Sequence, residues 1–357
     1  MYDIILSFIT AFTLTYLAIP SIIYIARVKH LVDEPGERRS HKVSTPSLGG
    51  IGIFAGIIFS TILWTPFEIF GNLQYMLCAL IFIFLIGAKD DIVPMLPTKK
   101  LLGQLIAAMI LVFKADVRLL SFHGVFEIYN LSYGVSAALS VFLIIVVINA
   151  FNLIDGINGL SGSIGTLICL FLGTWFIMAE QTVLALISFT TAGAVMAFLS
   201  YNFRAEIFMG DTGAMIIGMI CSVLTIKFLE LSAVLAIDSP LKFTAVPAIA
   251  LGLLILPLFD TLRVFVTRIF RGRSPLYPDR SHIHHLLIDS GLSHVQATLT
   301  LVFVNVIFLF LIYELQGLGT IPLILLTLGL AALLSGGLYQ KVRRMKRLHN
   351  KPVQSDT

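Results

Sequence analysis

The sequence predicts an all-α fold, a polytopic membrane bundle of about eleven transmembrane helices. Of the 357 residues, 57% are hydrophobic and only 12% are charged, and the mean hydropathy is +0.95. Soluble domains usually carry about a quarter charged residues, so little room is left for a soluble domain. The three cysteines all lie inside apolar runs, and we expect them to be small core residues without a disulfide.

Apolar runs long enough to cross a membrane recur along the whole chain, which is the second observation behind this fold class. They lie near residues 2–26, 47–64, 73–88, 101–115, 133–152, 161–179, 183–200, 212–230, 244–264, 296–315 and 319–340. Asp3 precedes the first run and basic residues follow it, so we expect a span and not a cleaved signal peptide. Residues 1–340 are predicted to form a single membrane domain and residues 341–357 a basic cytoplasmic tail.

The third observation is the sidedness of the basic residues. With eleven spans, 20 of the 24 lysines and arginines fall in one set of loops and in the C-terminal tail. Positively charged loops stay in the cytoplasm, so the N-terminus is predicted to lie outside and the C-terminus inside. The long loops 27–46 and 265–295 are then cytoplasmic.

Five aspartates lie where the apolar runs end, all on the predicted cytoplasmic side: Asp90, Asp91, Asp155, Asp211 and Asp260. An ion-coupled transporter, the main alternative, would place its coupling carboxylates nearer the bilayer midplane, on broken helices. A ring of acids at the membrane–water boundary instead suits chemistry between a water-soluble substrate and a lipid headgroup.

The segment NAFNLIDGINGL, residues 149–160, carries Asn149, Asn152, Asp155 and Asn158 at every third position. Such groups are costly in lipid, so they indicate a functional site. Asn, Asp and Gly together break a helix and gather oxygens and free N–H groups, which suits a metal ion and a phosphate. The alternative is a capped helix end followed by a tight turn.

Asp90 and Asp91 repel each other unless a cation or a proton intervenes. The loop that follows them contains two prolines and ends in Lys99 and Lys100. Magnesium binds through one or two carboxylates together with phosphate oxygens and water, which this arrangement could supply. A solvated helix end is the alternative for the acidic pair.

In NFRAEIFMGDTGA, residues 202–214, Gly210 and Gly213 bracket Asp211 at the start of an apolar run. Glycines allow close backbone approach, and a helix N-terminus favours an anion. Asp211 alternatively caps that helix. Phe208 either stacks on a nucleobase or anchors the chain in the membrane interface.

The segment PDRSHIHHLL, residues 278–287, contains His282, His284 and His285 after Arg280. Zinc is disfavoured because no cysteine is near and the acids lie in other loops. Histidine and arginine donors that reach a sugar or a pyrophosphate fit these surroundings better.

A second basic loop, ERRSHKVSTPSLGG at residues 37–50, ends in glycine. Arg38, His41 and Lys42 are its candidate phosphate contacts. Ordinary positive charge on a cytoplasmic loop is the alternative explanation.

In order, the segments DD…KLLGQ, NLIDGINGL, FMGDTGA and HIHH resemble the polyprenyl-phosphate N-acetylhexosamine-1-phosphate transferases. The resemblance spans nearly the whole chain, and the His-Ile-His-His form is similar to branches that use UDP-N-acetylglucosamine. It implies a helical bundle in the bacterial cytoplasmic membrane with a catalytic cleft on the cytoplasmic face. It also implies roles for residues in each segment.

By this resemblance, Asp211 is a metal ligand, with Asn152 and Asp155 beside the same ion. The implied catalytic residues are Asp90, Asp91, Asp155 and Lys100, the acidic pair handling the lipid phosphate. The implied substrate-binding residues are Phe208, Asn158, Gly210, His41, Lys42, Arg280, His282, His284 and His285. Of these, Phe208 and Asn158 would hold the uracil.

The implied reaction is Mg²⁺-dependent, with Mn²⁺ as a substitute. Undecaprenyl phosphate attacks a UDP-N-acetylhexosamine, most simply GlcNAc, UMP leaves, and the lipid-linked diphospho-sugar starts a cell-envelope polysaccharide such as O-antigen. Direct attack is preferred to a two-step route through an aspartyl-phosphate. The expected partners are both substrates, membrane lipid and a second copy in a homodimer, with no nucleic acid. A CDP-alcohol phosphatidyltransferase is disfavoured because Asp155-Gly156 lacks the Ala-Arg that this class requires.

Overall fold

The computed structural model describes residues 1–31, 45–71, 73–236, 238–272, 274 and 281–349. These residues contain no β-strand, which confirms the predicted all-α class. The helices are α1 (Tyr2–Val28), α2 (Gly49–Trp64), α3 (Leu73–Ile92), α4 (Pro97–Phe113), α5 (Tyr133–Ile154), α6 (Leu160–Met178), α7 (Thr182–Asn202), α8 (Gly210–Val234), α9 (Val246–Leu253), α10 (Ile255–Phe270), α11 (Ile283–Asp289), α12 (His294–Glu314) and α13 (Thr320–His349). Three short 3-10 turns, η1 (Phe67–Ile69), η2 (Val125–Glu127) and η3 (Gln316–Leu318), lie in the connections.

Seven of the described helices are long and apolar enough to cross a membrane: α1, α5, α6, α7, α8, α12 and α13. The bent pair α9 and α10 adds an eighth if it forms one span. These helices indicate a multi-pass membrane protein. The predicted runs at 47–64, 73–88 and 101–115 are also helical, as α2, α3 and α4, but the total of eleven spans and the orientation stay predictions.

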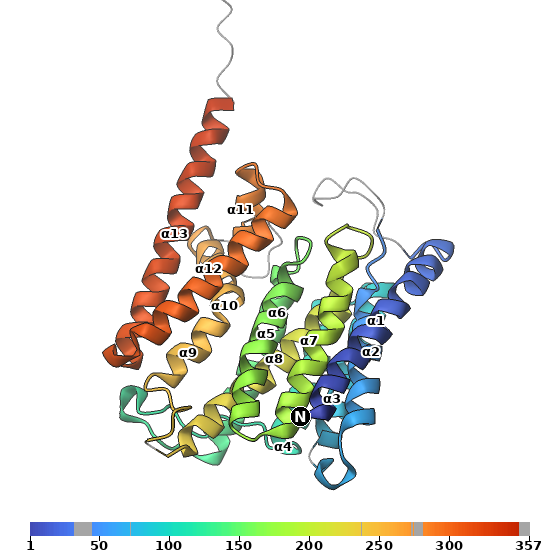
Figure 1. The fold of residues 1–357 in the computed structure, drawn as a ribbon. Helices are drawn as coiled ribbons and strands as arrows, with labels where there is room; N and C mark the ends of the chain where they lie inside the picture. The colour runs from blue at the N-terminus through green and yellow to red at the C-terminus, as the bar shows by residue number, and fades with distance from the viewer. Residues whose placement is uncertain (32–44, 72, 237, 273, 275–280, 350–357) are drawn as a thin grey trace, which may run out of the picture.

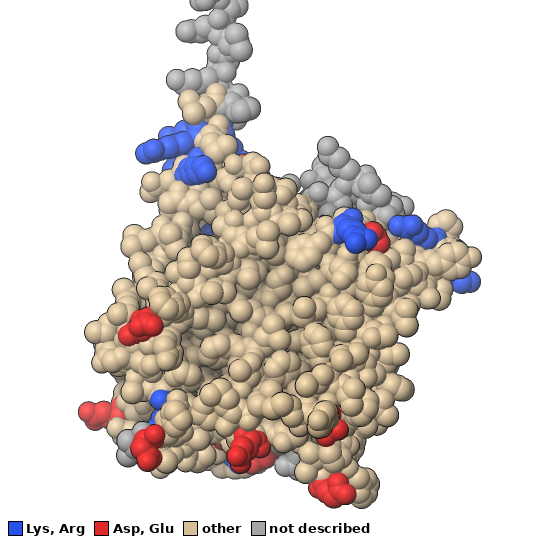
Figure 2. Space-filling model, viewed as in Figure 1, with Lys and Arg blue, Asp and Glu red and all other residues tan. Residues whose placement is uncertain are grey.

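Charged side chains gather at the two ends of the bundle, with a nearly uncharged band between them. In Figure 2 most of the visible lysines and arginines lie at the upper end, and most of the visible acids lie along the lower end. The N-terminus lies at the lower end, and α13 finishes at the upper end (Figure 1). An uncharged band between charged rims is the surface that a bilayer requires.

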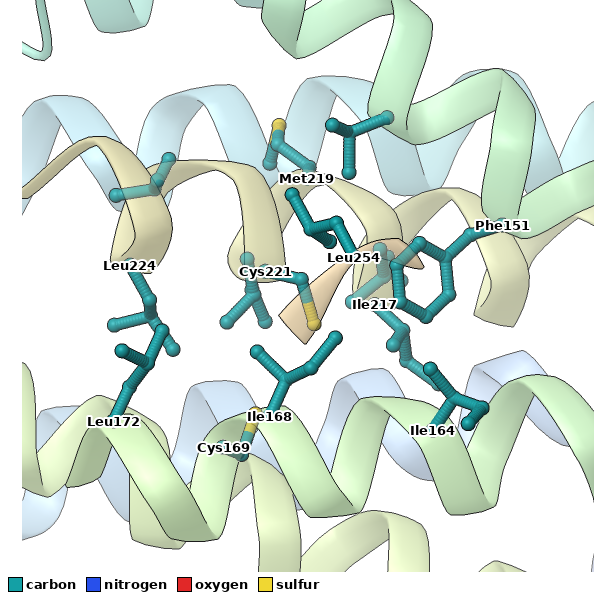
Figure 3. Close-up of a cluster of buried hydrophobic side chains, with 14 of the residues drawn as sticks. Phe151, Ile164, Ile168, Cys169, Leu172, Ile217, Met219, Cys221, Leu224 and Leu254 are labelled. Atoms are coloured by element: carbon teal, nitrogen blue, oxygen red, sulfur yellow. The ribbon is translucent and has the colours of Figure 1, made fainter. Parts of the chain in front are cut away.

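Helix α8 is the centre of the bundle. It packs against α5, α3, α2 and α6, and most of its apolar stretch is buried inside the bundle. Figure 3 shows part of the core that it forms with α5 and α6, around Phe151, Ile168 and Ile217. All three cysteines are free, and Cys169 and Cys221 are buried in this core as expected. The expectation of a core position was wrong for Cys78, which lies on an exposed face of α3.

The predicted run at 244–264 is not one straight helix. The chain bends by 77° between α9 and α10, at Leu254. Pro257 lies in the first turn of α10 and has no backbone N–H to donate to the carbonyl four residues earlier. Its ring also clashes with that carbonyl, so a straight helix cannot continue through this position. The bend gives α10 its own direction, and α10 carries Asp260, one of the boundary acids.

Helices α5 and α8 approach each other closely at Gly218, where a methyl group would lie 2.8 Å from the backbone Cα of Ile148. We therefore expect Gly218→Ala to push the helices apart and to lower the free energy of unfolding by about 1–3 kcal/mol. Thermal unfolding of the detergent-purified chain measures this. Gly329→Ala is the matched control, because a Cβ on Gly329 in α13 meets nothing within 4 Å. Equal melting temperatures for the two variants would contradict this account of the α5–α8 contact.

Candidate active site

Asp91, in the last turn of α3, holds the beginning of α8. Its carboxylate accepts hydrogen bonds from the backbone N–H of Asp211 at 2.7 Å and of Thr212 at 3.1 Å. The hydroxyl of Thr212 donates a third bond at 2.5 Å. First-turn N–H groups have no partner within their own helix, and a negative charge is favourable at that end. Asp91 therefore fixes the direction in which α8 leaves the site.

Gly210, the first residue of α8, permits this contact. Its φ is +72°, and a Cβ there would lie 2.2 Å from the carbonyl oxygen of Ser47 and 2.6 Å from Oδ2 of Asp91. A side chain would be strained and would also collide with both neighbours. The segment before α8 is tied down as well, because Phe208 donates to Pro46 at 2.7 Å and accepts from Gly49 at 3.0 Å. The Phe208 side chain is half-buried beside this junction.

Lys100 joins two of the predicted site aspartates. Its ammonium lies 2.6 Å from Oδ2 of Asp211 and 3.1 Å from Oδ2 of Asp90. The other oxygen of Asp90 accepts the backbone N–H of Met95 at 2.6 Å, in the loop between α3 and α4. That bond folds the loop back and brings Lys100, in the first turn of α4, to the start of α8. A cation between two carboxylates offsets their repulsion.

Asp155 begins the turn of residues 155–159 between α5 and α6. Its carboxylate accepts a hydrogen bond from Ser161, whose hydroxyl also lies 3.5 Å from the sulfur of Met209. Burial, together with the nearby charges of Asp211 and Asp91, raises the pKa of Asp155 to about 7. The aspartates that the sequence placed on separate runs therefore come within electrostatic range of one another. The side chain of Asn152, three residues earlier, is half-buried and makes no hydrogen bond with the described residues.

The turn that carries Asp155 is held by its neighbours. The backbone N–H of Gly159 donates to Oδ1 of Asn202 at 2.6 Å, and Asn202 in turn donates to the carbonyl of Ile207 at 2.8 Å. The carbonyl of Asn158 accepts the Thr298 hydroxyl of α12 at 2.8 Å. The side-chain oxygen of Asn158 is buried without a hydrogen-bond partner in the described structure.

Asn149, one turn before the end of α5, has a structural role. Its amide donates to the buried Gln104 of α4 at 2.7 Å and to the carbonyl of Ile145 at 2.8 Å. Gln104 donates back to Asn149 at 3.4 Å. The pair ties α4 to α5, which satisfies two amides that would otherwise be costly in an apolar interior.

Asp260 of α10 pairs with the histidine segment. Only 1% of its surface is exposed, and it accepts His282 Nδ1 at 2.9 Å, the Ile283 backbone N–H at 3.0 Å and Arg263 Nη2 at 3.0 Å. The sequence placed Asp260 among the boundary acids but gave it no role. One pattern in the sequence could have indicated this role: Asp260 lies in an apolar helix three residues after a proline, and a histidine-rich segment follows it.

His284 brings the histidine segment to the turn of Asp155. The ring is 2% exposed, and its Nε2 lies 2.2 Å from where a Cβ on Gly156 would be. Nε2 has no hydrogen-bond partner among the described residues. Burial lowers the pKa of His284 to about 3, so the ring is neutral at physiological pH. His285 is half-buried, with its ring 4.3 Å from that of His284.

The predicted site residues thus form two connected groups. Asp90, Asp91, Lys100, Asp155 and Asp211 meet at the ends of α3, α5 and α8, and the histidines reach them through the 155–159 turn. His41, Lys42 and Arg280 lie outside the described residues. What each residue does remains a prediction.

The predicted magnesium site has an oxygen donor set. Within the described part of the chain, no three His, Cys, Asp or Glu side chains are close enough to hold a metal by themselves. Magnesium does not need three such ligands, because it binds through one or two carboxylates and keeps several waters. Asp155, Asp211 and the amide of Asn152 supply oxygen donors of the kind that Mg²⁺ prefers.

Comparison with known proteins gives one family. The model of glycosyl transferase family 4 matches residues 73–229, from α3 through most of α8. This segment contains the acidic pair, Lys100, the 155–159 turn and the start of α8. The histidine segment and the helices α9 to α13 lie beyond it.

Curated relatives extend the match beyond this segment. The undecaprenyl-phosphate alpha-N-acetylglucosaminyl 1-phosphate transferase of Salmonella typhi is 30% identical over 75% of this chain and 71% of its own. The protein of the same name from Yersinia pestis is 29% identical over 75% of this chain and 72% of its own. A Bacillus subtilis relative is 27% identical over 86% and 84%. With its motifs meeting at one end of a helical membrane bundle, the chain belongs to glycosyl transferase family 4.

Proposed function

We propose that this protein transfers N-acetylglucosamine-1-phosphate from a UDP-sugar to undecaprenyl phosphate and releases UMP. The names of the relatives support the acceptor and the sugar. The observation that carries the proposal is the meeting of Asp211, Asp155 and Lys100 at one end of the bundle, from separate helices. An ion-coupled transporter is not favoured, because these carboxylates lie at helix ends and the family is one of transferases.

The proposed chemistry needs charge neutralisation more than covalent catalysis. An oxygen of the lipid phosphate bonds to the β-phosphorus of the UDP-sugar, and the bond from that phosphorus to the bridging oxygen breaks as UMP leaves. The diphosphate repels an anionic nucleophile, so positioning and electrostatics supply most of the rate enhancement. Bound Mg²⁺, with Mn²⁺ as a substitute, would neutralise and orient the diphosphate. Asp211, Asp155 and Asn152 would hold it.

The hydrogen bonds divide the acidic pair between two roles. Both oxygens of Asp91 are engaged by Asp211 and Thr212, so we assign Asp91 to positioning α8. Asp90, whose carboxylate contacts the backbone N–H of Met95 and the ammonium of Lys100, is assigned to the lipid phosphate. Lys100 then has an ammonium ready to contact a phosphate beside Asp211.

The histidine segment is proposed to close over the sugar and the pyrophosphate. His284 is neutral, and its Nε2 adjoins the turn of Asp155 without a partner in the described structure, so it has a free position for a substrate contact. His282, His285 and Arg280 belong to the same proposed surface. Phe208 and Asn158 are proposed to hold the uracil, beside the start of α8. The lipid-linked product would start a cell-envelope polysaccharide on the cytoplasmic membrane.

Asp211→Asn tests the metal and phosphate site. In membranes supplied with UDP-N-acetylglucosamine and undecaprenyl phosphate, we expect UMP release to fall by about 10²-fold or more, because the substitution removes a charged ligand. EDTA should abolish release by the unmodified protein, and added Mg²⁺ should restore it. Asp116→Asn, at an exposed aspartate paired with Arg118, is the control and should stay active. Full activity in Asp211→Asn would show that Asp211 is not a ligand of the metal and phosphate site.

Phe208→Ala tests nucleotide stacking. If the ring stacks on uracil, losing it should raise the KM for UDP-N-acetylglucosamine by about tenfold, since base stacking on an aromatic ring is worth about 1–3 kcal/mol. The KM for undecaprenyl phosphate should change little. Phe142→Ala removes an exposed aromatic ring from α5 and controls for loss of a membrane anchor. An unchanged KM for the nucleotide sugar would contradict stacking and favour the alternative, in which Phe208 anchors the chain in the membrane interface.

Asp260→Asn tests how the histidine segment is positioned. The amide can still accept the Ile283 N–H, but it cannot balance the charge of Arg263 or orient His282 as a carboxylate does. We expect kcat to fall by about tenfold or more while the KM for undecaprenyl phosphate stays near that of the unmodified protein. Asp260→Glu should recover part of the loss. A pure stability defect, with normal kcat in the folded fraction, would contradict a positioning role.

A further inference from the structure

A groove of about 1060 Å³ opens between α10, α11 and α13, apart from the carboxylate cluster. Helix α10 forms one wall, through Phe259, Leu262 and Arg263, and the last turns of α13 form the other. None of Asp90, Asp91, Asp155, Asp211 and Lys100 lines it. The groove and the carboxylate cluster therefore have no described lining residue in common.

The groove is strongly cationic. Among the described residues that line it, five are basic and one, Asp289, is acidic. The basic residues are Arg263, Arg271, Arg343, Lys346 and Arg347. Lys346 pairs with Asp289 at 2.7 Å and Arg263 with Asp260 at 3.0 Å. The side chains of Arg271, Arg343 and Arg347 make no ion pair or hydrogen bond with the described residues, so within this part of the chain three cations line the cavity without an acidic partner.

The rest of the described lining is mostly apolar, and part of it lies on the outer surface of the bundle. Leu262 and Val266 of α10 line the groove and are also exposed, at 55% and 41%. Ala332 and Val342 of α13 lie on the opposite wall. Cations beside an apolar wall match a ligand that is anionic at one end and hydrocarbon at the other. Basic pockets between transmembrane helices bind the headgroups of anionic lipids in this way.

The groove lies at the basic end of the bundle, where lysines and arginines gather over the upper part of α13 (Figure 2). A headgroup at that level would sit at the membrane–water boundary, with its acyl chains along the apolar wall. A soluble phosphate would gain nothing from that wall. We propose that this groove binds one anionic membrane phospholipid, with its phosphate between Arg271, Arg343 and Arg347. Because it shares no lining residue with the carboxylate cluster, the bound lipid is distinct from the acceptor in the proposed reaction.

The test compares two variants of the full-length chain that lose equal charge from the same helix. Arg343→Gln/Arg347→Gln removes two lining cations, and Lys341→Gln/Arg344→Gln removes two exposed cations that do not line the groove. Native mass spectrometry of the detergent-purified protein, titrated with palmitoyl-oleoyl phosphatidylglycerol or phosphatidylcholine, counts the bound lipids. We expect the unmodified chain to bind one phosphatidylglycerol at least about tenfold more tightly than phosphatidylcholine. The lining variant should lose that preference, and the control variant should keep it.

Three outcomes would overturn the proposal. Equal affinity for the two lipids would show that the groove does not recognise an anionic headgroup. Equal losses in both variants would show only a general attraction of the basic tail for anionic lipid. Displacement of phosphatidylglycerol by inorganic phosphate at comparable concentration would show that the apolar wall contributes nothing. No arm measures catalysis, so the result is independent of the proposed transferase activity.

Discussion

The site depends on the capping of α8 by Asp91. A helix N-terminus inside a membrane protein has N–H groups that neither its own turns nor lipid can satisfy. Asp91 satisfies two of them and the Thr212 hydroxyl, while Gly210 lets α3 and the Ser47 backbone approach closely enough. Because α8 is the central helix, this one contact sets where Asp211 points relative to α3 and α5. The family segment 73–229 contains both sides of this contact.

A second constraint couples the C-terminal helices to this centre. Pro257 bends α9 from α10, and α10 then presents Asp260 to the segment that begins at His282. The buried carboxylate neutralises Arg263 and fixes the first residues of α11, and His284 reaches the 155–159 turn. A buried charge is tolerated only when it is paired and hydrogen-bonded, and Asp260 meets both conditions. The histidines therefore reach the carboxylates through packed contacts between separate parts of the chain.

The sequence predicted those features that a single continuous segment determines, such as an apolar helix or a short motif. Hydropathy predicted helical structure at each of the eleven runs. The resemblance to a known family, carried by the order of the motifs, grouped the acidic pair, the turn after α5 and the start of α8 as one set. Long-range pairing was not visible in this way. Nothing near Asp91 indicates that its partners lie 120 residues away, and nothing near Asn149 indicates Gln104 of α4. The bend at Leu254 had a local cause in Pro257, but a continuous apolar run concealed it.

The account rests on Asp155 and Asp211 sharing one divalent cation. Diffraction from crystals of the full chain grown with Mn²⁺, measured at the manganese absorption edge, locates such an ion without reference to activity. The account predicts a single anomalous peak at coordination distance from both carboxylates, with Asn152 beside it, and no peak in crystals of the Asp211→Asn variant. A peak that binds to other residues, or a map in which Asp155 and Asp211 point away from each other, would contradict it.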